Sequence, residues 1–270
     1  MLEKISTVKP HKFNVLLTLF SAFIYLAIVS FKGFDLTDEG FCLSFYQQFF
    51  QNPTSVTYQF MFYLTGLFGG IWEVLFGWGG ILSFRFFNAL VIILTAFMTY
   101  KATEEYLQPI VFSLATFCVI LLNNYGNIVF HHNYFSALLV AIAVLFLLKG
   151  FKRNKKSDYY FAGFFIGLSF FARIPNITML SLGFLFLVNV YYSKDWKQFW
   201  KSLLLWVCGW GTAIILILCS MYVLGHFNIF INSIAENIFS LAIEDDSNHN
   251  LITMMTSYLY NYVQISRLLV

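Results

Sequence analysis

The stretch that decides the topology of this chain is VTYQFMFYLTGLFGGIWEVLF, residues Val56–Phe76. It is long and apolar enough to cross a bilayer, which takes about 20 residues of helix. It also contains Glu73 and three glycines, Gly66, Gly69 and Gly70, and a Gly-Trp-Gly-Gly turn follows it. Whether this stretch crosses the membrane decides on which side every later loop lies.

The composition of the whole chain places it in a membrane. Of its 270 residues, 59% are hydrophobic, 21% aromatic and only 11% charged, whereas soluble domains carry about 25% charged residues. This excludes a cytosolic enzyme, a secreted disulfide scaffold and a disordered chain. The net charge of +3 is small, so no nucleic-acid partner is expected.

Apolar runs of helical length recur along the sequence. They predict an all-α, polytopic transmembrane bundle with about seven or eight spans, forming a single domain over residues 1–270. The end of the chain at Val270 further suggests a bundle that is cut short. The predicted spans are Phe13–Phe31, Ile81–Tyr100, Leu107–Asn123, Tyr134–Leu148, Tyr159–Ala172, Ile174–Tyr192 and Phe199–Leu224, with Leu251–Val263 as a candidate eighth.

The lysines and arginines decide whether Val56–Phe76 is a further span. If it does not cross, 12 of the 16 basic residues share one side of the membrane; if it does, nine of those twelve lie outside. Cytoplasmic loops are rich in Lys and Arg, so we predict a cytoplasmic N-terminus and an interfacial helix inside a long outer loop, residues 32–80, with a later outer loop over 225–250. The twelve are Lys4, Lys9, Lys12, Lys101, Lys149, Lys152, Arg153, Lys155, Lys156, Lys194, Lys197 and Lys201.

The predicted first outer loop begins with an acidic cluster. Asp35, Asp38 and Glu39 fall within five residues, just past the first apolar run. Ionisable groups at a membrane boundary are costly and often functional. On a helix, Asp38 and Glu39 would point about 100° apart, so one could face a site while the other holds structure. A solvated loop is the alternative interpretation.

An acidic pair just after the first helix resembles the first outer loop of GT-C superfamily glycosyltransferases, such as the protein O-mannosyltransferases and the bacterial aminoarabinose transferases of lipid A. The stretches Phe84–Leu90 (FRFFNAL) and Gly163–Pro175 (GFFIGLSFFARIP) resemble later motifs of the same superfamily. The resemblance implies sugar transfer, with inversion, from a polyprenyl-phosphate donor to a glycan, lipid or protein acceptor on the outer face. A bacterial cytoplasmic membrane is the expected location.

The resemblance also implies roles for individual residues. Asp38 corresponds to the catalytic base, which would accept the proton of the acceptor hydroxyl. Glu39 would orient Asp38 or bind a divalent metal ion, the only cofactor left open. The candidates for binding substrate or phosphate are Asp35, Arg85, Arg173, His131, His132 and Asn133.

Other interpretations of these residues stay open. Arg173 could contact lipid headgroups, and His131 and His132 could be polar aromatic residues of the interface whose side chains, being adjacent, point different ways. Many family members have an acid where this chain has Asn133. A multi-pass transporter is the main alternative function, and a truncated, non-catalytic membrane protein is another. The later helices are nearly free of charge and show no inverted repeat, which argues against transport.

Overall fold

The computed structural model describes residues 12–33, 38–122, 128–235, 256, 257 and 260. This part of the chain is helical and contains no strand, which confirms the all-α prediction. The helices that run along the bundle are α1 (Lys12–Val29), α4 (Gly80–Thr103), α5 (Pro109–Leu122), α6 (His132–Arg153), α7 (Lys156–Ala172), α8 (Phe184–Ser193) and α9 (Trp196–Val223). The other elements are the α-helices α2 (Asp38–Gln51), α3 (Tyr63–Phe76) and α10 (Phe227–Ile234), and the 3₁₀ segments η2 (Pro53–Phe62), η3 (Gly77–Gly79) and η4 (Ile174–Gly183).

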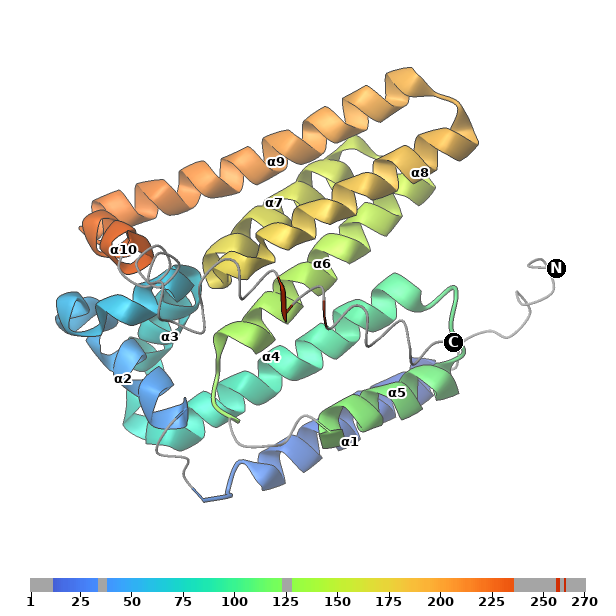
Figure 1. The fold of residues 1–270 in the computed structure, drawn as a ribbon. Helices are drawn as coiled ribbons and strands as arrows, with labels where there is room; N and C mark the ends of the chain where they lie inside the picture. The colour runs from blue at the N-terminus through green and yellow to red at the C-terminus, as the bar shows by residue number, and fades with distance from the viewer. Residues whose placement is uncertain (1–11, 34–37, 123–127, 236–255, 258–259, 261–270) are drawn as a thin grey trace.

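The helices that run along the bundle lie side by side, and α2, α3 and α10 gather at one end of them (Figure 1). Helix α7 packs between α6 and α9, and α6 in turn packs on α4. Helices α1 and α5 lie together on the other side of α4. The bundle therefore has a broad part around α7 and a smaller part in which α5 leans on α1.

Four helical stretches are long and apolar enough to cross a membrane: Pro53–Thr103, His132–Arg153, Ile174–Ser193 and Trp196–Val223. The stretches Asn14–Val29 and Pro109–Leu121 are shorter apolar helices. These helices support a multi-pass membrane protein, while the count of seven or eight spans stays a prediction. Most of the candidate eighth span lies outside the described residues.

The segment Val56–Phe76 is not one straight helix. Its backbone leaves helical geometry at Val56 (φ −126°, ψ 31°) and again at Phe62 (φ −106°, ψ 38°). The 14 residues of α3 span about 21 Å, less than the roughly 30 Å of a hydrocarbon core. An interfacial position for this segment therefore stays our proposal.

The glycines of α3 allow its contact with α2. A Cβ atom built at Gly66 would collide with the ring of Phe45, and one at Gly69 would collide with the ring of Tyr46. Tyr46 stacks on Phe84 of α4 at 5.2 Å between ring centroids, and its hydroxyl donates to the backbone oxygen of Phe130 at 2.6 Å. Helix α2 is thereby fixed against the end of the bundle.

The glycine motif in α7 has a packing role. A Cβ atom at Gly163 would collide with the backbone oxygen of Trp206, and one at Gly209 of α9 would collide with that of Tyr160. Small residues at such crossings let helix backbones approach closely, as they do in membrane proteins generally. This close crossing holds α7 against α9.

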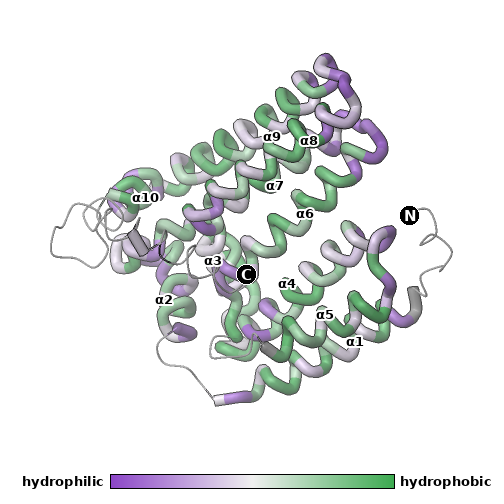
Figure 2. Tube along the Cα trace, turned by 45° about the vertical axis from the view of Figure 1, so that its right-hand side comes forward, coloured by the Kyte–Doolittle hydropathy of each residue, from purple (hydrophilic) through white to green (hydrophobic). Residues whose placement is uncertain are grey.

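Polar residues separate to the two ends of the bundle. The lysine-bearing connections between α4 and α5, α6 and α7, and α8 and α9 lie at one end, and α2 and α10 lie at the other (Figures 1 and 2). The helical stretches between the two ends are largely apolar (Figure 2). We call the end that carries α2 the acidic end and the opposite one the lysine end.

Candidate functional site

The candidate residues come from different helices and meet at the acidic end. Asp38 and Glu39 form the first turn of α2. His131 is the N-cap of α6, and Arg173 follows the last residue of α7. Asp35 lies outside the described residues, so its expected role stays a prediction.

Glu39 and Arg85 form a buried ion pair. Arg85 Nη2 lies 2.6 Å from Glu39 Oε2, and Arg85 Nε lies 3.2 Å from Glu39 Oε1. The same guanidinium donates from Nη1 to the backbone oxygens of Ser30 and Lys32, both at 2.7 Å, and from Nη2 to that of Gly33 at 2.9 Å. The five donors of the guanidinium therefore all have protein acceptors.

The sequence predicts that Arg85 binds substrate or phosphate, but the structure places it in a buried ion pair. Arg85 is 3% exposed and has no donor left for a phosphate. It joins the end of α1 to the start of α2 instead. Glu39 Oε1 also accepts from the backbone N–H of Ile128 at 3.3 Å. Of the acidic pair, Glu39 is buried and held, while Asp38 is exposed.

His131 caps helix α6 with its side chain. Its Nδ1 accepts the backbone N–H of Asn133 at 3.2 Å, so the neutral ring carries its proton on Nε2 and can donate it. Burial lowers the pKa of His131 to about 4, Asp38 opposes this shift and Arg173 adds to it. His131 is therefore uncharged at neutral pH, and it lies close enough to both Asp38 and Arg173 to respond to their charges.

The neighbouring histidine belongs to a stack of rings. His132 lies flat on Phe62 with ring centroids 3.9 Å apart. It also stacks on His131 at 4.2 Å, so the two adjacent rings face each other rather than pointing apart. The reason is that His131 has extended backbone (φ −158°, ψ 154°) while His132 begins the helix. Asn133 is exposed and brings no carboxylate to this position.

The described residues do not fit a divalent metal ion. They contain no group of three His, Cys, Asp or Glu side chains that could hold one. Both oxygens of Glu39 are bonded to Arg85, and His131 Nδ1 is used by the helix cap.

Sequence reasoning missed the role of Asn88. It lies one turn after Arg85 on α4, is 1% exposed, and donates from Nδ2 to the backbone oxygen of Ile128 at 3.0 Å. The chain just before α6 is thereby held by both Asn88 and Glu39. A signal was present, because Arg85 and Asn88 are polar residues three apart in an apolar helix.

The apolar helices of the bundle are those of a multi-pass membrane protein, and the candidate residues lie together at one end of it. The family model of the dolichyl-phosphate-mannose-protein mannosyltransferases matches residues 63–223. The chain belongs to this family of GT-C-type membrane glycosyltransferases. The matched residues include Arg85, His131 and Arg173 but not Asp38 and Glu39. Comparisons with curated proteins and with solved structures gave no match.

Proposed function

We propose that this chain transfers a sugar from a polyprenyl-phosphate donor to an acceptor hydroxyl at the acidic end, with Asp38 as general base. Membership of the family supports a lipid-linked donor. One observation carries the role of Asp38: it is the exposed member of the acidic pair, while the neighbouring Glu39 is buried and held by Arg85. The charge of Asp38 also acts on His131, where it opposes the lowering of the histidine pKa.

The proposed reaction is a single displacement. The acceptor oxygen attacks the anomeric carbon and forms the new glycosidic bond. The bond between that carbon and the phosphate oxygen breaks, and its electron pair leaves with the polyprenyl phosphate. Asp38 takes the proton of the acceptor hydroxyl. General base catalysis of this kind contributes about 10²–10⁴-fold to a rate.

The leaving phosphate gains negative charge, and Arg173 is our candidate to stabilise it. Arg173 is partly exposed, and its own backbone N–H is bonded to Ser169. Ile174 and Pro175 follow it in the chain. The side chain of Asn176 then donates to the backbone oxygen of Ser169 at 3.1 Å, and this bond fixes the turn after α7. His131 would add an uncharged donor through Nε2. Arginine suits phosphate because its planar donors match two phosphate oxygens.

The two ends of the bundle support an orientation in the membrane. The lysine end carries the connections that are typical of cytoplasmic loops. We propose that it faces the cytoplasm together with the N-terminus, so that α2 and the proposed site lie at the outer boundary of a bacterial cytoplasmic membrane.

Replacing Arg173 by glutamine is expected to lower kcat/KM for the lipid-linked donor by about 10–100-fold, because a hydrogen bond to the charged leaving phosphate is lost. The measurement is transfer of labelled sugar by the purified chain in proteoliposomes. Arg153→Gln is the matched control, since Arg153 is exposed at the lysine end. Equal effects of the two substitutions would contradict the role of Arg173.

A further inference from the structure

The short segment Ile128–Phe130, which leads into α6, is bound to both α2 and α4. The backbone N–H of Ile128 donates to Glu39 Oε1 of α2 at 3.3 Å, and its backbone oxygen accepts from Asn88 Nδ2 of α4 at 3.0 Å. All three residues of the segment are buried. Because a buried backbone group without a partner is costly, both helices stabilise the segment in this place.

Phe130 repeats the pattern two residues later. Its backbone oxygen accepts from the hydroxyl of Tyr46 in α2 at 2.6 Å, and its N–H donates to the backbone oxygen of Phe84 in α4 at 3.3 Å. Tyr46 is buried, and its ring stacks on that of Phe84. Each of the two helices therefore binds both Ile128 and Phe130, so a shift of the segment against either helix would break hydrogen bonds.

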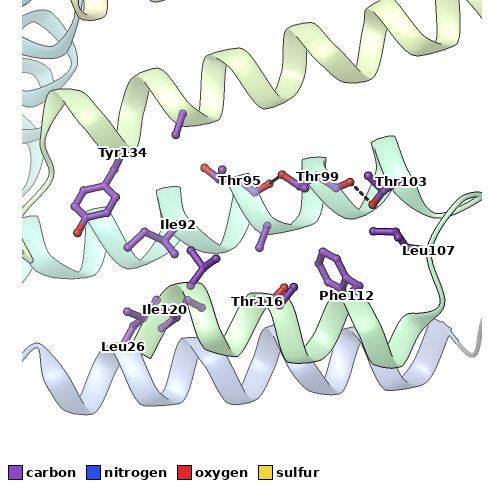
Figure 3. Close-up of a pocket in the computed structure, with 14 residues that line it drawn as sticks. Leu26, Ile92, Thr95, Thr99, Thr103, Leu107, Phe112, Thr116, Ile120 and Tyr134 are labelled. Carbon is purple, nitrogen blue, oxygen red and sulfur yellow. Dashed lines mark hydrogen bonds between the residues drawn. The ribbon is translucent and has the colours of Figure 1, made fainter. Parts of the chain in front are cut away.

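These hydrogen bonds matter because packing does not hold the first turn of α6 on every side. Asn133 is exposed, and Tyr134 lines a groove of about 310 Å³ that α6 forms with α1, α4 and α5 (Figure 3). His131, which caps this turn, is only partly buried. The place of His131 therefore depends on the residue before it, the doubly bonded Phe130.

We infer that Tyr46 is a positioning residue, which sets the distance between Asp38 and His131. Asp38 and Tyr46 belong to the same helix, α2, and Tyr46 holds the residue that precedes His131. The inference rests on the proposed function, in which Asp38 takes the acceptor proton and His131 donates to the leaving phosphate. The two groups act on opposite sides of one anomeric carbon, so their separation must match an in-line displacement.

Replacing Tyr46 by phenylalanine removes the hydroxyl and keeps the ring. We expect kcat for sugar transfer to fall by about tenfold, within the roughly 100-fold that misplacing a reacting group by about 1 Å can cost. The KM for the donor should change little, because the buried Tyr46 acts through Phe130 and not on the donor.

The matched control is Tyr63→Phe. Tyr63 is also buried, and its hydroxyl lies 3.2 Å from Ser220 Oγ of α9. This variant loses a hydrogen bond of the same kind at the same end of the bundle, but not one to the segment before α6. It should keep the kcat of the unaltered chain. Equal kcat values for Tyr46→Phe and Tyr63→Phe would overturn the inference.

A titration of His131 separates this inference from the proposed function, because it needs no substrate. NMR of the chain in detergent, with ¹⁵N-labelled histidine, follows the pKa of His131. Burial lowers this pKa to about 4, while Asp38 opposes the shift and Arg173 adds to it. A released segment would bring the ring into water, so Tyr46→Phe should raise the pKa of His131 toward its usual 6.5. Tyr63→Phe should leave it unchanged.

Asn88→Ala gives a second measurement if Tyr46→Phe folds poorly. It releases the segment from α4 at Ile128, and it should raise the pKa of His131 in the same direction. A raised pKa in both variants of a chain that transfers no sugar would support the positioning of His131 and contradict the proposed function. An unchanged pKa of His131 in the folded variants of a chain that transfers sugar would overturn the inference.

Discussion

Replacing Glu39 by glutamine is expected to lower the free energy of unfolding by about 3–5 kcal/mol, the usual effect of removing one partner of a buried ion pair. Glu39 is fully buried, and its loss leaves the charge of Arg85 with three backbone oxygens as its partners among the described residues. The measurement is unfolding in detergent. Glu104→Gln is the control, because Glu104 pairs with Lys101 at 2.9 Å in a partly exposed position, where such pairs contribute about 0–1 kcal/mol.

A double variant keeps this prediction testable if the single variant folds poorly. Glu39→Gln combined with Arg85→Gln removes both charges, so the combined loss of stability should be smaller than the sum of the two single losses. Arg85→Lys should also lower the free energy of unfolding, because one ammonium group cannot donate to Glu39 and to the three backbone oxygens at the same time. Additive losses would contradict the coupling between α2 and α4 that we describe.

Replacing Asp38 by asparagine is expected to lower kcat by about 10²–10⁴-fold, because the acceptor hydroxyl loses its proton acceptor. Asparagine has nearly the same shape and Asp38 is exposed, so stability and the KM for the donor should change little. The measurement is single-turnover transfer with saturating lipid-linked donor in proteoliposomes.

The matched control for Asp38 is Asp195→Asn at the lysine end. Asp195 caps α9 by accepting the N–H of Gln198 at 2.9 Å, and asparagine caps helices equally well. This variant should transfer sugar at the rate of the unaltered chain. A kcat of Asp38→Asn as high as that of Asp195→Asn would remove Asp38 from the mechanism.

Much of the fold could be predicted because hydropathy and helix length are local properties. Each of the seven predicted spans contains helix, from α1 to α9. The interfacial position that the lysines predict for Val56–Phe76 stays a prediction, and the structure divides this segment into η2 and α3. The residues that break it, Val56 and Phe62, carry no turn signal of their own, so the position of each break was not predictable.

The partners of the charged residues could not be predicted, since they depend on how distant segments meet. The backbone oxygens of Ser30, Lys32 and Gly33 converge on Arg85 only because α1 ends beside α4. The sequence shows an arginine at a membrane boundary, which fits a phosphate ligand as well as a structural cation.

The measurement that tests the account most directly is the anomeric configuration of the transferred sugar, determined by NMR on the first product formed. A single displacement with Asp38 as base predicts a configuration opposite to that in the donor. Retention of the donor configuration would require two displacements through a covalent glycosyl intermediate. That result would contradict the role of Asp38 as a base acting on the acceptor.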